Sequence, residues 1–209
     1  MKIHTTFGNA TIFDRSGGYR SPTVEVIALF ALLYLVRLGT SVPTALAFPL
    51  SRAPWTLVTS VYTHASLWHL LGNTVGVLIL GVGVERITTP KRFHAFFYAT
   101  GVLSGLSEIT VRAFLGTGVP VLGASGGMLA LFGYAMVANP VTYRMIVGLD
   151  IDPKIETMGF LSLSGVIVVA GASPNVAIVA HFVGLLLGIG AGRIRLLHAE
   201  PSDSLTSRR

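Results

Sequence analysis

The sequence contains no cysteine and very little charge. Without cysteine, disulfides, thiolate metal sites and cysteine nucleophiles are excluded. Only 11% of the residues are charged and 52% are hydrophobic, whereas a soluble domain has about 25% charged residues. This balance excludes an ordinary soluble domain and predicts an all-α, polytopic membrane protein. The 24 glycines fit that class, because small residues let helices approach closely in lipid.

The chain also lacks a basic patch and an apolar leader. Its 15 lysines and arginines are not interleaved with aromatic residues, so the net charge of +6 does not indicate a nucleic-acid partner. Residues 1–22, an expected cytoplasmic tail, have no apolar core of the kind found in cleavable signal peptides. Residues 198–209 are expected to form a polar C-terminal tail. Residues 23–197 between them are expected to form one membrane domain.

Six apolar segments are candidates for membrane-spanning helices, each of which needs roughly 20 residues. Ser21-Pro22 marks the start of the first, because a capping residue followed by proline is typical of a helix N-terminus. The connection 39–66 contains three prolines and several aromatic rings, and we expect it to lie in the membrane interface. The predicted spans are 23–38, 67–84, 93–115, 125–143, 155–171 and 175–197.

The positive charges orient these six spans. Lysine and arginine accumulate on the cytoplasmic side of membrane proteins. If both termini are cytoplasmic, 12 of the 15 basic residues lie on the inner side, and only Arg37, Arg52 and Arg112 lie on the outer side. We therefore predict both termini inside.

With this topology, three spans carry polar residues near their outer ends. His69 and Asn73 are four residues apart in the second span and so share one face. Ser125 opens the fourth span after an apolar loop, and His181 lies in the sixth. At 1.5 Å per residue, Asn73 and His181 each lie roughly 9 Å below the expected helix starts. A nucleophile, a base and hydrogen-bond donors are thus expected to gather in the outer third of the bilayer.

The motifs around these residues resemble those of the rhomboid family of intramembrane serine proteases. Gly-x-Ser-Gly occurs at residues 123–126, His-x-x-x-Asn at 69–73, and Ala-His-x-x-Gly-x-x-x-Gly at 180–188. Each motif is weak alone, but three in this order are a strong signal. The resemblance covers about residues 55–197 and implies a six-helix rhomboid-like fold. It further implies transmembrane protein substrates in the lipid bilayer and no cofactor or metal.

The chemistry of these residues and the resemblance suggest a role for each. Ser125 is the expected nucleophile and His181 its general base. The sixth span contains no acidic residue, which favours a Ser-His dyad over a triad. Asn73, His69 and the backbone N–H of Ser125 are expected to stabilise the oxyanion. His64 is expected to shape the site.

Five glycines are expected to support the site. Two of them follow the serine and should let the sixth helix bring His181 within reach, while two more lie on the face of that helix beside the histidine. They are Gly123, Gly126, Gly127, Gly184 and Gly188.

Two positions depart from the family pattern. Thr56 follows Trp55 where the family often has arginine, so the membrane-perturbing role of that arginine is not expected here. Leu129 stands four residues after the serine, where many members have an aromatic residue stacked on the catalytic histidine. His181 must therefore be oriented by helix packing.

Other interpretations have less support. The zinc-protease motif His-Glu-x-x-His is absent, and Asp150 and Asp152 fall in an inner loop and not in a span. A catalytically inactive rhomboid-like protein that binds or moves membrane clients remains open. A small transporter would leave the three motifs unexplained. Glu85 and Glu108 are interpreted as structural, the latter with no evident partner. The short tails favour a prokaryotic plasma-membrane protein with its site toward the outer face, while the oligomeric state stays open.

Overall fold

The computed structural model describes residues 20–138, 155, 158–159, 162 and 177–199. Across these residues it contains α-helices, one short 3-10 turn and no β-sheet beyond a single bridge pair. The all-α class predicted from the sequence is therefore confirmed. The elements are α1 (Pro22–Gly39), η1 (Leu50–Arg52), α2 (Thr56–Tyr62), α3 (Leu67–Glu85), α4 (Pro90–Phe114), α5 (Ser125–Ala138) and α8 (Ile178–Arg193).

Side-chain caps set the starts of three long helices. The Ser21 hydroxyl accepts a hydrogen bond from the backbone of α1, and Ser66 does the same for α3 at 3.2 Å. Thr89 caps α4, and Pro90 occupies its first turn, where a missing N–H has no cost. This cap explains why α4 begins three residues before the expected start at Phe93.

Five of the six predicted spans correspond to described helices. The first two match α1 and α3 to within a residue at each end, and α5 starts at Ser125 as expected. Among the described residues, α1 and α3 are the two helices long and apolar enough to cross a membrane by length and composition, while α5 and α8 are shorter apolar helices. The fifth predicted span, 155–171, lies almost entirely outside the described residues.

Two expectations about helix positions are wrong. The connection 39–66 contains the helix α2, and α8 covers 178–193 instead of 175–197. It ends early because Arg195 adopts a left-handed conformation, with φ of 51°, and Leu196 bonds back to Ala191 at 3.0 Å. His181 therefore lies roughly 4.5 Å into its helix, half of the expected 9 Å.

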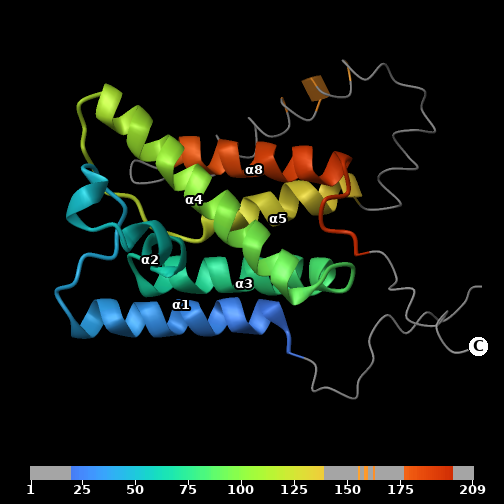
Figure 1. Cartoon of the computed structure of the whole chain (residues 1–209), viewed down its shortest axis with the longest axis horizontal. Coiled ribbons are helices and arrows are strands. Elements are labelled where there is room, and N and C mark those ends of the chain that lie inside the picture. The colour runs from blue at the N-terminus through green and yellow to red at the C-terminus, as the bar shows by residue number, and fades with distance from the viewer. Residues whose placement is uncertain (1–19, 139–154, 156–157, 160–161, 163–176, 200–209) are drawn as a thin grey trace, which may run out of the picture.

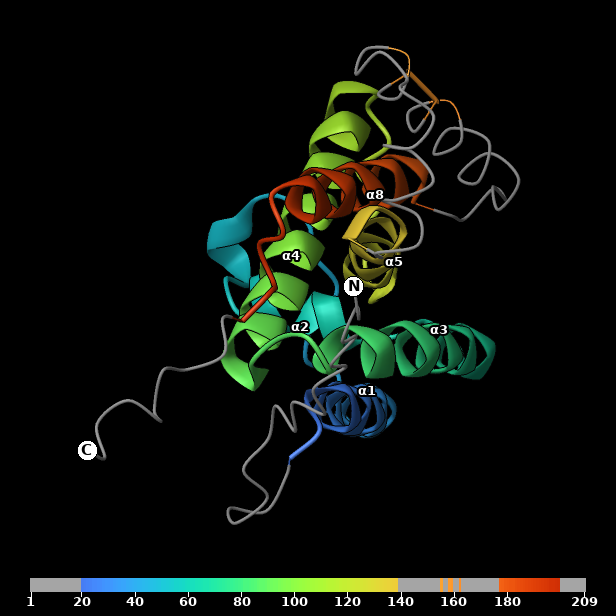
Figure 2. The same ribbon diagram turned by 90° about the vertical axis from the view of Figure 1, so that its right-hand side faces the viewer.

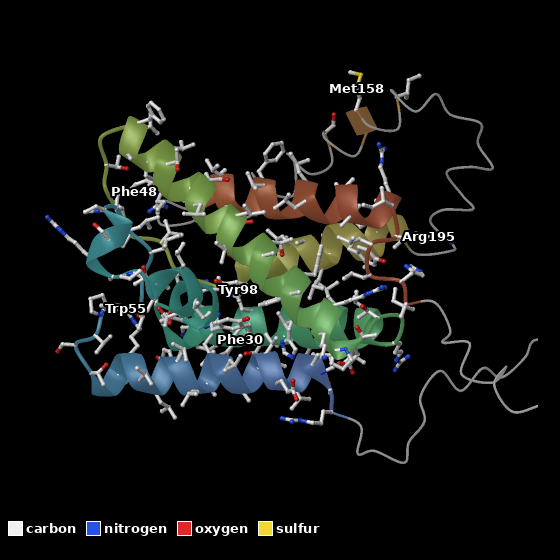
Figure 3. All side chains as sticks on the ribbon, in the orientation of Figure 1. Phe30, Phe48, Trp55, Tyr98, Met158 and Arg195 are labelled. Carbon is white, nitrogen blue, oxygen red and sulfur yellow. The ribbon has the colours of Figure 1, made fainter. Side chains whose placement is uncertain are left out.

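The helices pack in two groups joined by α4. Figures 1 and 2 show α1 beside α3 on one side of the molecule and α5 beside α8 on the other, with α4 crossing at a steep angle. Buried aromatic side chains fill the junction. Phe97 of α4 lies 6.2 Å from Phe30 of α1 and 6.1 Å from Tyr62 of α2, measured between ring centroids. Phe30 is labelled in Figure 3. The α4 helix thereby fixes the position of α5 and α8 relative to the rest.

Residues 194–199, here called the C-terminal strap, close the end of the bundle where α8 terminates. The N–H of Ala199 donates to the carbonyl of Ile87 at 3.0 Å, and Arg92 donates to the carbonyl of His198 at 2.7 Å. The Tyr134 hydroxyl lies 2.7 Å from Nδ1 of His198. Burial, and next the nearby Arg195, lower the pKa of His198. Nδ1 of the neutral ring can therefore accept a hydrogen bond from the tyrosine hydroxyl, so the strap ties α8 to α4 and α5.

Candidate active site

The loop before α5 is held by backbone hydrogen bonds to the segment between α1 and α2. Leu46 and Val121 form an antiparallel pair, with N–H to O distances of 2.7 and 2.9 Å. The N–H of Gly123 donates to the carbonyl of Ser60 in α2 at 2.9 Å. The loop that ends at Ser125 is therefore fixed by elements far away in the sequence.

Gly123 is required by both conformation and space. Its φ is 131°, which L side chains rarely adopt, and a Cβ there would lie 2.7 Å from Cε1 of His69. Only glycine lets the imidazole of His69 lie against the loop that carries Ser125.

Ser125 and His181 meet across the interface of α5 and α8. Nε2 of His181 lies 2.8 Å from Oγ of Ser125, although the two residues are 56 positions apart in sequence. Ser125 is the first residue of α5, and His181 lies in the first turn of α8. This is the distance expected between a nucleophile and its base.

The close approach of α8 to α5 depends on glycines of α8. A Cβ at Gly184 would collide with the backbone of Gly126, and one at Gly188 would collide with the backbone of Ala130. The glycines after the serine face another way: a Cβ at Gly126 would lie 2.6 Å from Cβ of Ser104, and one at Gly127 would lie 2.8 Å from the carbonyl oxygen of Phe97. Both of those contacts are with α4. The missing side chains of these two glycines therefore mainly make room for α4 and not, as expected, for the sixth helix, although a Cβ at Gly126 would also lie 3.8 Å from the carbonyl oxygen of Ala180 in α8.

His69 and Asn73 lie on the α3 face that borders Ser125 and His181. The Asn73 side chain is buried, with 5% of its surface exposed, and its Nδ2 donates to the carbonyl of His69 at 2.9 Å. An amide nitrogen carries two hydrogens, so one N–H of Asn73 is left for another acceptor.

His64 lies behind His69 and does not line the cleft. Its ring is fully buried and contacts His69 edge-on at a centroid distance of 5.0 Å, with Phe30 at 4.8 Å on another side. Burial, and after it the neighbouring His69, lower the pKa of His64 to about 4. A neutral His64 packs against His69 and limits the positions that the His69 ring can take.

His69, Asn73, Ser125 and His181 line a cleft of about 670 Å³ between α3, α5 and the start of α8. A groove between α4 and α8 is larger, at about 870 Å³, but its lining is apolar apart from Arg92 and Thr100 and contains no histidine or carboxylate that could act as a base. We therefore assign the chemistry to the smaller cleft. Its lining comprises Ala65, Ser66, Trp68, His69, Gly72, Asn73, Arg112, Pro120, Val121, Leu122, Ser125, Met128, Ala177 and His181.

The two departures from the family pattern have clear structural positions. Leu129 packs against Leu185 and Ile189 in an apolar cluster between α5 and α8. Met128, beside it, lines the cleft together with His181. Thr56 is buried at the start of α2, where its hydroxyl donates to the carbonyl of Ala53 at 2.6 Å.

Glu108 is a residue near the site that the sequence interpretation left without a partner. One carboxylate oxygen accepts a hydrogen bond from the backbone N–H of Ala180 at 3.0 Å, and the other pairs with Arg112 at 2.6 Å. The Glu-Arg spacing of four residues predicts the ion pair on a helix. No sequence signal predicts the contact with α8. Over the described part of the chain, acidic and histidine side chains form no cluster suited to a metal ion.

Comparison with known proteins gives concordant matches. A rhomboid domain model matches residues 51–198. "RHOMBOID-like protein 6, mitochondrial" of Arabidopsis thaliana is 30% identical over 150 residues, which cover 70% of this chain and 45% of that protein. "Rhomboid-related protein 2" of Mus musculus is 29% identical over 146 residues, covering 66% and 47%. "Rhomboid protease GluP" of Bacillus subtilis is 26% identical over 135 residues, covering 60% and 26%. The chain thus spans less than half the length of each of these relatives.

Proposed function

The chain belongs to the rhomboid family, and on that premise we propose that it is an intramembrane serine endopeptidase acting through a dyad of Ser125 and His181. The observation that carries the proposal is the 2.8 Å contact between Oγ of Ser125 and Nε2 of His181. That contact opens onto a cleft lined by further hydrogen-bond donors. A nucleophile, a base and oxyanion donors in one cleft are the requirements of acyl transfer.

The geometry supports a two-step reaction. As Ser125 Oγ attacks the scissile carbonyl, Nε2 of His181 takes the hydroxyl proton, and the carbonyl oxygen becomes an oxyanion. When the carbon–nitrogen bond breaks, the imidazolium returns that proton to the leaving amine, which leaves an acyl group on Ser125. Water then attacks the ester and gives its proton to His181. When the ester carbon–oxygen bond breaks, the imidazolium gives its proton to Oγ of Ser125, which restores the serine and releases the second product as a carboxylic acid.

The oxyanion would be held by donors from two helices. The first N–H groups of α5, starting with that of Ser125, have no intrahelical acceptor, as at any helix start. His69 and the second N–H of Asn73 supply side-chain donors from α3. One such donor typically stabilises the transition state by about 3 kcal/mol.

We place the cleft toward the outer face of a membrane, with both termini cytoplasmic. The positive-charge asymmetry supports this orientation. The 16 residues of α8 span about 24 Å, less than a hydrocarbon core of about 30 Å. If Arg193 and Arg195, at the C-terminal end of α8, lie at the inner interface, His181 lies below the outer one. In this proposal residues 23–197 form the membrane domain, 39–66 lie at the interface, and 1–22 and 198–209 are tails. A prokaryotic plasma membrane is the proposed location.

The proposed substrates are transmembrane segments of other membrane proteins. The helices that line the cleft are membrane helices in this proposal, so a substrate would reach it from the bilayer. A peptide carbonyl can reach Ser125 only if the substrate helix is locally unwound, because a stable helix engages its carbonyls in hydrogen bonds. The family resemblance further implies that the substrate has a small residue immediately before the scissile bond. The chemistry proposed here uses no cofactor.

A serine-directed fluorophosphonate probe tests the assignment. The purified protein in detergent is labelled alongside Ser125→Ala and His181→Ala, and cleavage of a model transmembrane substrate is followed in parallel. We expect the wild type to label and cleave, and both variants to lose both activities. Gly190→Ala serves as a control, since a Cβ at Gly190 would meet no atom within 4 Å.

Two results would overturn the assignment. Labelling that persists in Ser125→Ala would show that another residue is the nucleophile. A folded wild type that neither labels nor cleaves, yet still binds transmembrane segments, would favour the non-catalytic alternative of a protein that binds membrane clients.

A further inference from the structure

The helix that carries His181 has no side-chain cap of its own. Its N-cap residue is Ala177, which makes no side-chain hydrogen bond to the first turn. Most helices satisfy one N–H of this turn with a serine, threonine, aspartate or asparagine side chain. In α8 the acceptor comes from another helix: Oε2 of Glu108, in α4, accepts the N–H of Ala180 at 3.0 Å.

The surroundings of Glu108 hold its carboxylate in one place. Only 5% of the residue is exposed, and Oε1 pairs with Nε of Arg112 at 2.6 Å, one turn further along α4. The positive end of the α8 dipole also favours a carboxylate at this position. Both oxygens therefore have partners, one in α4 and one in α8.

The contact falls next to the dyad. Ala180 is bonded directly to His181, whose Nε2 lies 2.8 Å from Ser125 Oγ. On the other side, Gly126 follows Ser125 and packs against Ser104, one turn before Glu108 in α4. The α4 helix thus contacts the immediate neighbour of each dyad residue.

Building on the proposed protease function, we propose that Glu108 is a positioning residue for His181, and that it acts by capping α8 from α4. The carboxylate bonds to the backbone of the first turn and sets how far α8 is rotated and shifted along its axis. In a Ser-His-Asp triad the acid orients the imidazole by bonding the ring itself. Here the acid orients the helix on which the imidazole stands.

Substitution of Glu108 separates this role from simple stabilisation. Glu108→Leu removes the acceptor, whereas Glu108→Gln keeps an oxygen that can accept the Ala180 N–H. Glu85→Leu is the matched control, because Glu85 is similarly buried and accepts the Thr23 N–H at the start of α1 at 3.2 Å. Arg112 is left unchanged, since its side chain also lines the cleft.

The readouts are the rate of fluorophosphonate labelling per folded molecule, kcat and KM on a model transmembrane substrate, and hydrogen exchange of the first-turn amides of α8. Loss of the cap should misplace His181 by a fraction of an ångström to about 1 Å, which can lower a rate by up to about 100-fold. We expect Glu108→Leu to lower labelling and kcat roughly ten- to 100-fold, with KM nearly unchanged. Exchange at the start of α8 should rise. Glu108→Gln should recover most of the rate, and Glu85→Leu should keep it.

Three outcomes would overturn the proposal: an unchanged rate in Glu108→Leu, an equal rate loss in Glu85→Leu, or no recovery in Glu108→Gln. If the wild type neither labels nor cleaves, the proposed protease function fails. Hydrogen exchange then still tests whether Glu108 caps α8. If exchange of the first-turn amides of α8 does not rise in Glu108→Leu, Glu108 does not hold this helix.

Discussion

Substitution of Gly184 by alanine is expected to separate Ser125 from His181. A Cβ at Gly184 would lie 3.0 Å from both Cα and the carbonyl carbon of Gly126, and closer still to its carbonyl oxygen. Ordinary contact begins at 3.4 Å, so α5 and α8 must separate by at least 0.4 Å, the difference between 3.4 and 3.0 Å. The contact is with backbone, so no side chain can turn aside to relieve it.

This separation is large enough to disturb the dyad. Gly184 lies three residues after His181, so the shift is transmitted through less than one turn of α8. Added in full to the 2.8 Å contact, it gives 3.2 Å, and clearing the carbonyl oxygen extends it further. Hydrogen bonds weaken beyond about 3.2 Å. We expect Gly184→Ala to lower the labelling rate roughly ten- to 100-fold and the free energy of unfolding by about 1–3 kcal/mol.

Gly190→Ala provides the control on the same helix. Nothing lies within 4 Å of a Cβ at that position, and alanine stabilises a helix by about 0.5–1 kcal/mol relative to glycine. Labelling time courses and thermal unfolding in detergent are measured on both variants. Gly190→Ala should label at the wild-type rate and unfold at the same temperature as the wild type or a higher one. If Gly184→Ala labels and unfolds like the wild type, the two helices are not held at this distance and the reasoning fails.

Two further predictions concern the ends of the bundle. Glu85→Ala is expected to lower the free energy of unfolding by about 1.5–3 kcal/mol, because Glu85 accepts the Ser21 hydroxyl at 2.7 Å and the Thr23 N–H at 3.2 Å; an unchanged denaturation midpoint would contradict this. Tyr134→Phe should cost about 1 kcal/mol by removing the bond to His198. Since the folded pKa of His198 is lowered, stability should be complete above the unfolded pKa of about 6.5 and should fall as the pH drops toward the folded value. His198→Gln should reduce that loss of stability at low pH. If the wild type and His198→Gln give identical profiles of unfolding midpoint against pH, His198 is not the group responsible.

Much of the fold follows from local sequence signals. The cap at Ser21 marks the start of α1, and the lengths of the two apolar runs predict α1 and α3 to within a residue at each end. The helix α2 is missed because seven residues after a proline-rich stretch give too short a pattern. The end of α8 is missed because apolar residues continue past Arg193 and Arg195 to Leu197, and hydropathy alone does not separate a helix from the strap that follows it.

The sequence predicts which residues meet at the candidate site but not how they are supported. The motifs predict that Ser125 and His181 lie near each other, and the structure brings them together. The sequence does not reveal that Gly127 packs on α4, since a glycine contains no information about which neighbour it faces. Nor does it reveal the cap by Glu108, because the acceptor meets a backbone N–H that every residue possesses.

The separation of 56 positions between Ser125 and His181 also determines when the dyad can form during synthesis. Ribosomes add about 5–20 residues per second, so the base is made roughly 3 to 11 s after the nucleophile. The strap that fixes α8 follows later still. A chain interrupted before α8 would carry the proposed nucleophile without its base. The proposed activity would therefore begin only after α8 is made.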